Sequence, residues 1–248
     1  MKFAPRRLFL LPLAALLPLG LAGCGGGADP EPAAATQPSK PPVDCAVDKC
    51  VALTFDDGPG QFTGRLLDEL SEAEAHATFF VLGENVKKYP DEAKRIVDEG
   101  HQIGSHSWDH KDITTLTAEG IEHEVDWTDQ AVQDAAGVTP GVFRPPYGAH
   151  GVVYDRLIAK PLVLWDVDTL DWKHHDPVKT VDIAMDEVHN GSIVLMHDIH
   201  ESSVQAVPDL VQALRKAGYE LVTVDKLFDG QQFENSTAYA SRLEAQEK

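Results

Sequence analysis

Short apolar segments alternate with helical patterns between residues 51 and 224, and this alternation constrains the fold more than any other feature of the sequence. The apolar segments have the length and the β-branched and aromatic content of buried strands. Strands that alternate with helices are typical of a parallel sheet covered by helices. About seven such units suit a (β/α) barrel, complete or incomplete, better than an open sheet.

The expected strands and helices can be read along the chain. We expect strands at residues 51–55, 77–82, 102–105, 142–143, 161–166, 192–196 and 219–224. We expect helices at residues 62–75, 90–100, 118–136, 152–159, 178–188 and 204–216. A proline at the first position and a glycine at the end, as in Pro90 and Gly100, is typical of helix boundaries.

The amino-terminal segment has the pattern of an export signal. Residues 1–23 begin with basic side chains, continue with an apolar stretch from Leu8 to Ala22, and end in small residues. That stretch is shorter than the ~20 apolar residues that a membrane span needs. The sequence Leu21-Ala22-Gly23-Cys24 is similar to the lipobox of bacterial lipoproteins, in which Cys24 is lipidated after cleavage. An ordinary signal peptide with a chance cysteine is the alternative.

The composition divides the remaining chain into three parts. Residues 24–44 hold the predicted lipidated cysteine and a Pro/Gly/Ala-rich linker, which cannot bury a core. Residues 45–230 form the expected folded domain, and residues 231–248 a polar, frayed tail. In an exported protein Cys45 and Cys50 are expected to form a local disulfide.

Charge and missing motifs exclude several functions. The formal net charge is −19, and loss of Lys2, Arg6 and Arg7 with the signal would make it −22. A chain with this acid excess does not present the basic face that nucleic-acid binding needs. There is no GxGxxG after a strand and no GxxxxGK[ST], which argues against nucleotide binding.

Polar side chains gather directly after the expected strands. In a barrel the loops after the strands converge, so residues at these places share one site. Five clusters occupy such positions: Asp56-Asp57, His106 with His110, residues 144–148, residues 166–172, and His197-Asp198. Five separate placements indicate a common site, whereas one would mean little.

Two of these clusters point to a metal ion. Adjacent carboxylates repel each other unless a positive group lies beside them, so one of Asp56 and Asp57 could bind a metal while the other acts as a base. An Asp-rich turn is the alternative. Histidines four residues apart, His106 and His110, suit a shared metal on one face of a helical turn. Ser107 stands where the HExxH motif has its glutamate, so the base must lie elsewhere.

Five motifs in order carry a family resemblance. TFDDGPG at 54–60, HSWDH at 106–110, RPPYG at 144–148, DTLDW at 168–172 and LMHD at 195–198 resemble the motifs of NodB-type polysaccharide deacetylases, the family-four carbohydrate esterases. The resemblance covers residues from about 50 to 229, essentially the whole folded part.

The resemblance implies a distorted (β/α) barrel and a metal-dependent N-deacetylase. Asp57, His106 and His110 would bind the metal, usually zinc, sometimes cobalt or another divalent ion. Asp56 would be the general base and Arg144 would orient it. His197 would be the general acid, tuned by Asp171 or Asp168, with Asp171 favoured. The Tyr147 backbone N–H would belong to an oxyanion hole. Substrate contacts would come from Pro146, Tyr147, Trp108, Trp172 and Leu195.

These expectations lead to one principal function and two alternatives. The principal one is removal of N-acetyl groups from an N-acetylglucosamine-containing glycan, peptidoglycan or chitin, by a monomeric lipoprotein held at the cell envelope by Cys24. The first alternative is O-deacetylation, as in acetylxylan esterases. The second is a lipoprotein that binds glycan without turnover.

Overall fold

A parallel sheet organises the molecule. The computed structural model describes residues 42–229, 231 and 233–242. In the main sheet the strand order is β3-β2-β1-β6-β5, and β7 pairs with the first part of β1. All of these pairings are parallel. The strands are β1 (Cys50–Asp56), β2 (Thr78–Val81), β3 (Gln102–Ser105), β5 (Val167–Asp168), β6 (Ile193–His197) and β7 (Glu220–Leu221).

Single bridges extend this sheet into a curved series of strands. Phe143 bridges Ser105 at the end of β3 and Leu162 at the start of β4 (Leu162–Val163). Strand β4 pairs in parallel with β8 (Ala238–Tyr239), and Ser241 then bridges Ser192 just before β6. The predicted mixed α/β fold with parallel strands is therefore confirmed. Single bridges rather than full ladders join part of this series of strands.

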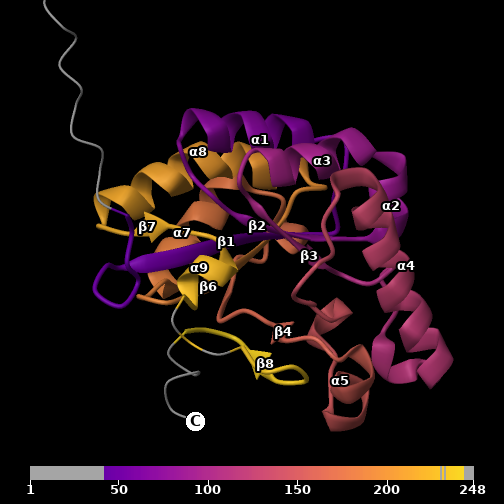
Figure 1. The fold of residues 1–248 in the computed structure, drawn as a ribbon. Helices are drawn as coiled ribbons and strands as arrows, with labels where there is room; N and C mark the ends of the chain where they lie inside the picture. Colours follow the sequence, from indigo (N-terminus) through magenta and orange to yellow (C-terminus); the bar gives the residue numbers. More distant parts are fainter. Residues whose placement is uncertain (1–41, 230, 232, 243–248) are drawn as a thin grey trace, which may run out of the picture. The chain divides into compact units, whose positions relative to one another are not determined.

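Helices pack side by side around the strands. Helices α1, α3 and α8 cover one face of the sheet, while α5 lies near β4 and β8 (Figure 1). Contacts run in the order α7, α8, α1, α3, α4 and α5. The helices are α1 (Thr63–Glu72), α2 (Gly83–Lys88), α3 (Pro90–Asp98), α4 (Ala118–Ala136), α5 (Val152–Ile158), α6 (Asp171–His174), α7 (Pro177–Glu187), α8 (Glu201–Lys216) and α9 (Val224–Leu227), with 3-10 turns η1 (Ile113–Thr115) and η2 (Pro146–Gly148).

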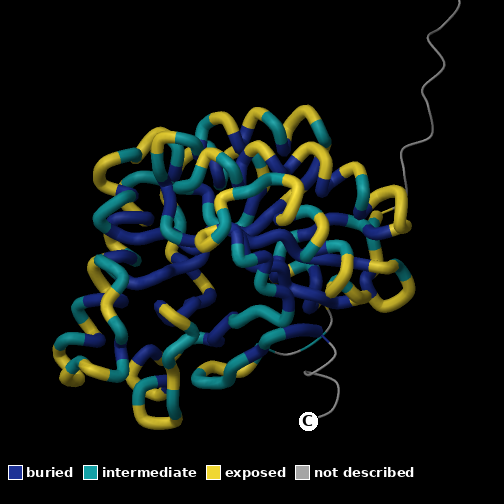
Figure 2. Tube along the Cα trace, turned by 180° about the vertical axis from the view of Figure 1, so that it is seen from behind, coloured by how far each residue is buried: buried dark blue, intermediate teal, exposed yellow. Residues whose placement is uncertain are grey.

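The sheet forms the centre of the core. Every residue of β1 is buried, and Leu66, Leu67 and Leu70 of α1 pack against this strand region. Buried segments occupy the interior while the outer turns of the helices are exposed (Figure 2). A strand buried on both faces cannot alternate apolar and polar residues, which explains its continuous apolar sequence.

The structure differs from the sequence expectations in its shortest elements. Helices α2, α6 and α9 and strand β5 were not predicted, and β4 covers only two of the six residues expected at 161–166. The structure also differs from the expected frayed tail at residues 231–248. Residues 233–242 continue the fold beyond residue 230, because β8 pairs with β4 and the Tyr239 ring packs against Phe228 and Phe233.

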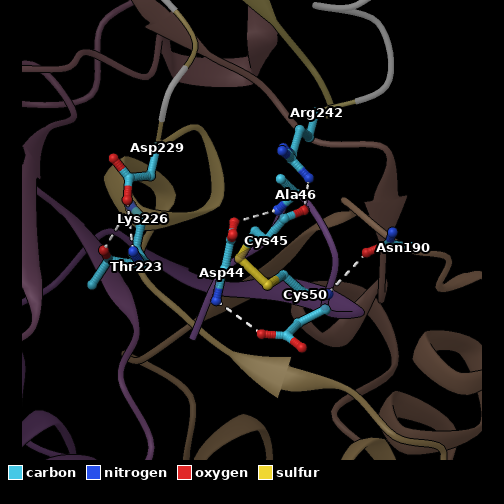
Figure 3. Close-up of a disulfide and its surroundings, with 10 residues drawn as sticks. Asp44, Cys45, Ala46, Cys50, Asn190, Thr223, Lys226, Asp229 and Arg242 are labelled. Carbon is cyan, nitrogen blue, oxygen red and sulfur yellow. Dashed lines mark hydrogen bonds and ion pairs between the residues drawn. A yellow bond between two sulfur atoms is a disulfide. The ribbon is translucent and has the colours of Figure 1, made fainter. Parts of the chain in front are cut away.

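The domain begins at the amino end of β1. Cys45 and Cys50 are joined by a disulfide, and Arg242 donates a hydrogen bond to the Cys45 carbonyl (Figure 3). Asn190 accepts a hydrogen bond from the Cys50 N–H (Figure 3). Both ends of the described chain are thus fastened at this side of the sheet.

The predicted signal at residues 1–23, Cys24 and nearly all of the linker lie outside the described residues. Among the residues that are described, no helix has the length and apolar character needed to cross a membrane.

Candidate active site

A pocket lies where the strands end. Asp56 and His197 are the last residues of β1 and β6 and are paired in register, and His106 follows the last residue of β3. The pocket has a volume of about 430 Å³. Its lining consists of Asp56, Asp57, His106, His110, Tyr147, Trp165, Asp168, Trp172, Leu195 and His197. The predicted motifs therefore meet in one place, although their roles remain predictions.

Asp57, His106 and His110 form a group that fits a metal ion. The Nε2 atoms of both histidines lie 3.5 Å from Asp57 Oδ1. Two ligands of a tetrahedral zinc ion, each about 2.0–2.1 Å from it, lie about 3.4 Å apart. Asp57 Oδ1 is buried and has no hydrogen-bond donor among the described residues. A buried carboxylate oxygen without a partner is costly, so the donor set and its geometry both fit a divalent ion.

The loop that carries the two histidines is not helical, contrary to the sequence expectation. Ser107 and His110 have left-handed backbones, with φ of 72° and 64°. The His110 N–H donates to Ser107 Oγ at 3.1 Å. Glu124 of α4 is almost fully buried, and its Oε2 accepts hydrogen bonds from the N–H groups of Trp108 and Asp109. Tertiary contacts rather than helical spacing therefore bring the histidines together.

His106 is held in the tautomer that a metal ligand needs. Its Nδ1 lies 2.7 Å from the Arg144 carbonyl oxygen. A carbonyl only accepts hydrogen bonds, so Nδ1 carries the proton and Nε2 faces Asp57 with a free lone pair. Burial lowers the pKa of His106 to about 3, which keeps the ring neutral.

Asp56 is fixed by a buried arginine. Arg144 Nη1 donates to Asp56 Oδ1 and to Thr54 Oγ1, both at 2.7 Å. Its Nε and Nη2 donate to the carbonyl oxygens of Val163 and Leu164. Burial raises the pKa of the Asp56 carboxyl, and the Arg144 charge opposes that shift. The strand carbonyls thus hold a fully buried cation against Asp56 and restrict its rotation.

On the other side of the pocket, His197 is paired with Asp171. His197 Nδ1 lies 2.9 Å from Asp171 Oδ1. Asp171 Oδ2 accepts from the His197 N–H at 2.8 Å and from Ser203 Oγ at 2.5 Å. Burial lowers the pKa of His197, but the hydrogen bond and charge of Asp171 outweigh it and raise the pKa to about 9. His197 therefore carries a proton at neutral pH.

The structure distinguishes the two acids that were predicted to tune His197. Asp171 makes the contact, whereas Asp168 lines the pocket and its Oδ1 accepts from the Leu170 N–H at 2.9 Å. Leu170 has a left-handed backbone with φ of 54°, so the chain reverses between the two carboxylates. This reversal sends two acids three residues apart to different places.

The expected substrate contacts divide into two groups. Tyr147, Trp172 and Leu195 line the pocket, and the Tyr147 and Trp172 side chains are 71% and 46% exposed. Pro146 is buried and is not part of the lining. Trp108 is also outside it. Its ring is partly buried and packs edge-on against Trp127 of α4, away from the residues that line the pocket.

Gly58 lies so close to the Asp198 side chain that no larger residue fits at this position. A Cβ at this position would lie 2.3 Å from the carboxylate oxygens of Asp198. Asp198 is fully buried and accepts a hydrogen bond from Thr63 Oγ1. The turn after Asp57 thus has room only for glycine.

Four contributing residues were missed from the sequence. Trp165 lines the pocket, Glu124 holds the histidine loop, Ser203 contacts Asp171, and Thr54 contacts Arg144. Thr54 is the first residue of TFDDGPG and Trp165 directly precedes the polar cluster at 166–172, so both could have been found there. Glu124 and Ser203 lie within helices, where nothing in the sequence indicated a polar contact to a loop.

Comparisons with known proteins agree with this arrangement. A sequence model of polysaccharide deacetylases matches residues 44–161. The solved structure of T48 deacetylase with substrate is 73% identical in sequence to this chain and superposes on it with a TM-score of 0.79. The match covers 80% of this chain and 100% of that one. The chain belongs to the polysaccharide deacetylase family.

Two further members show the range of the family. Peptidoglycan-N-acetylglucosamine deacetylase PgdA of Listeria monocytogenes is 41% identical over 181 residues, which are 73% of this chain and 39% of PgdA. This family member thus matches well under half the length of that relative. A family 4 acetyl xylan esterase of Clostridium thermocellum, solved with a cobalt ion, is 30% identical with a TM-score of 0.75, over 78% of this chain and 98% of that one.

Proposed function

We propose that this protein is a metal-dependent hydrolase that removes N-acetyl groups from N-acetylglucosamine units of an envelope glycan and releases acetate. The observation that carries the proposal is the convergence of Asp57, His106 and His110 beside the Arg144-bound Asp56. A metal-binding triad next to a fixed carboxylate base is the arrangement that hydrolysis of an amide by water requires.

A bound divalent ion would polarise the acetyl carbonyl and lower the pKa of water. Asp56 would accept the proton of the attacking water. Arg144 holds Asp56 through a hydrogen bond of 2.7 Å, so the carboxylate keeps one orientation while it gains that proton. The oxygen of Asp56 that Arg144 does not bind is the one available for this transfer.

His197 would supply the proton that the leaving nitrogen needs. An amine leaves readily only when it is protonated, and His197 holds its proton because Asp171 faces Nδ1. This leaves Nε2 to face the pocket. The backbone N–H of Tyr147 would stabilise the developing oxyanion, a contribution often worth about 3 kcal/mol in kcat.

The pocket walls suit a sugar ring. Tyr147 and Trp172 present exposed aromatic surface, and Leu195 adds a small buried apolar surface. Aromatic rings favour the apolar face of a pyranose, while the acetyl group is small enough for a pocket of about 430 Å³.

Peptidoglycan is the proposed substrate, with chitin oligomers next. The proposal is supported by the similarity to PgdA and by the expected position of a monomeric lipoprotein, anchored by Cys24 outside the cytoplasm beside the wall. The likeness to the xylan esterase makes O-deacetylation the second candidate.

The test is acetate release from peptidoglycan, chitin oligomers and acetylxylan, with and without chelator. We expect release from the N-acetylated glycans, loss with chelator, and recovery when zinc or cobalt is added. Asp56→Asn should abolish release, and the exposed Asp91→Asn should not. Full activity of Asp56→Asn would refute Asp56 as the base. Absence of release by the unchanged protein would leave glycan binding as the better account, and exclusive activity on acetylxylan would favour the esterase.

A further inference from the structure

The carboxylate of Asp168 belongs to the pocket but has no place in the proton transfers described above. It is the last residue of β5, beside Leu195 of β6 in register, and both residues line the pocket. Asp171, three residues later, turns away toward His197 and Ser203. Asp168 is thus an acid that faces the ligand space without contacting the proposed base or acid.

Asp168 is oriented yet still able to bind a ligand. Its Oδ1 accepts the Leu170 N–H at 2.9 Å, which fixes the rotation of the carboxylate. No lysine, arginine or histidine among the described residues forms an ion pair with it. The residue is half-buried and Oδ1 takes the one hydrogen bond, so Oδ2 remains available to a ligand. A fixed, accessible carboxylate oxygen is a strong acceptor for a sugar hydroxyl.

Charge balance indicates which sugar this acid favours. With a divalent ion on Asp57, the positive charges at the site are that ion, Arg144 and protonated His197. They are balanced by the four carboxylates of Asp56, Asp57, Asp168 and Asp171. Without the Asp168 charge the loaded site would be cationic. A neutral site gives no attraction to an anionic sugar ring, and a nearby carboxylate repels one.

We propose that Asp168 is a specificity-determining residue, which accepts a hydrogen bond from a hydroxyl of a neutral sugar ring and disfavours rings that carry a carboxylate. In glycan strands without their stem peptides, the lactyl group of N-acetylmuramic acid is such a carboxylate. The inference rests on the proposed deacetylase function and selects N-acetylglucosamine as the sugar bound in the pocket.

The test uses Asp168→Asn, which keeps an oxygen for the Leu170 N–H but removes the charge. Chitotetraose and peptide-free glycan strands are the substrates, and mass spectrometry identifies which sugar loses acetate. We expect KM for chitotetraose to rise about tenfold while kcat changes less than about threefold. The preference for glucosamine over muramic acid rings should fall by about tenfold.

Binding to the metal-free protein provides a second readout. Calorimetric titration with chitotetraose should give a Kd about tenfold weaker for Asp168→Asn and for Asp168→Ala than for the unchanged chain. The exposed Asp186→Asn on α7 is the control and should bind as the unchanged chain does.

Two results would overturn the inference, and a third would refute the proposed function on which it rests. One is an unchanged sugar preference with unchanged KM. Another is a basic limb of the kcat profile that moves as expected for Asp171→Asn, because Asp168 would then act on His197. The third is a wild-type protein that binds chitotetraose but releases no acetate from any glycan, which refutes the proposed function itself. Metal-free binding that weakens in Asp168→Asn would still identify the ligand-facing carboxylate in that last case.

Discussion

His106 and His197 are both largely buried at strand ends of one pocket, yet their ionisation is opposite. Burial lowers the pKa of His106 to about 3, whereas Asp171 raises the pKa of His197 to about 9. Burial acts in the same direction on both rings. The partner of Nδ1 differs: His106 faces a backbone carbonyl and His197 faces a carboxylate. One hydrogen-bond partner therefore decides whether a pocket histidine can bind a metal or deliver a proton.

The largest effect should come from Asp57, His106 and His110, the residues that fit a metal ion, which we call the metal half of the pocket. His106→Ala removes a ligand atom and leaves Asp57 with a single histidine partner. We expect zinc affinity, measured by competition with a chelator, to fall by more than about 100-fold, and acetate release to be lost at ordinary zinc concentrations. His76→Ala, at an exposed position outside the pocket, is the control. Unchanged zinc affinity would show that His106 has no ligand role.

The second effect concerns the pair His197 and Asp171, which we call the acid half of the pocket. Asp171→Asn removes the charge that raises the pKa of His197, so this pKa should fall from about 9 toward its ordinary value near 6.5. A general acid acts in its protonated form, so activity of the unchanged protein declines as pH rises through about 9. In the variant this decline should begin about 2.5 pH units lower, and kcat at pH 8 should drop about 30-fold.

A pH profile of kcat from 5 to 10 measures both quantities. Zinc affinity should stay within about threefold of the unchanged protein, because Asp171 does not touch the metal half. A basic limb that stays near pH 9 in Asp171→Asn would refute the pairing as the source of the His197 charge.

A smaller effect is expected at Glu124, which supports the metal half indirectly. Glu124→Met keeps the volume but leaves the N–H groups of Trp108 and Asp109 without their acceptor. We expect about tenfold weaker zinc binding and a lower melting temperature. Glu124→Gln, which retains an oxygen acceptor, should recover most of the affinity, and exposed Glu122→Met should change neither quantity. Equal zinc binding in all three variants would contradict a positioning role.

The smallest effect should come from Ser203, the corresponding support of the acid half. Ser203→Ala removes one of the hydrogen bonds that Asp171 accepts and leaves the His197 contact in place. A net loss of about 1 kcal/mol corresponds to roughly a fivefold decrease in kcat. Steady-state measurement of kcat for Ser203→Ala checks this, with Ser202→Ala as the control. A loss as large as that of Asp171→Asn would mean that Ser203 itself takes part in proton transfer.

The sequence predicted the parts of the fold with strong local signals. The apolar run at β1 and the helix α4, with Thr117 as its cap and left-handed Gly137 at its end, correspond to the expected elements. The positions of Asp56 and His197 at strand ends followed from the same runs. Strand β8 could not be predicted, because two residues paired with a distant strand leave no periodic pattern.

The local geometry of the site depended on contacts that sequence spacing does not encode. A left-handed backbone, which residues other than glycine rarely adopt, occurs at four places in the site: Ser107, His110, Tyr147 and Leu170. The spacing of the histidines therefore suggested a helical turn that is absent. The same limit explains why Asp168 and Asp171 were both assigned to His197, since only the reversal at Leu170 separates them.

The fastening of both chain ends at the start of β1 has a mechanical consequence. Strand β1 has seven residues, so about 20 Å of straight backbone separates Cys50 from the pocket edge at Asp56. Any segment that precedes Val43 joins the domain at this end of the sheet, beside the disulfide and the hydrogen bond from Arg242 to Cys45. The pocket mouth lies at the opposite end of β1, about one strand length from that point.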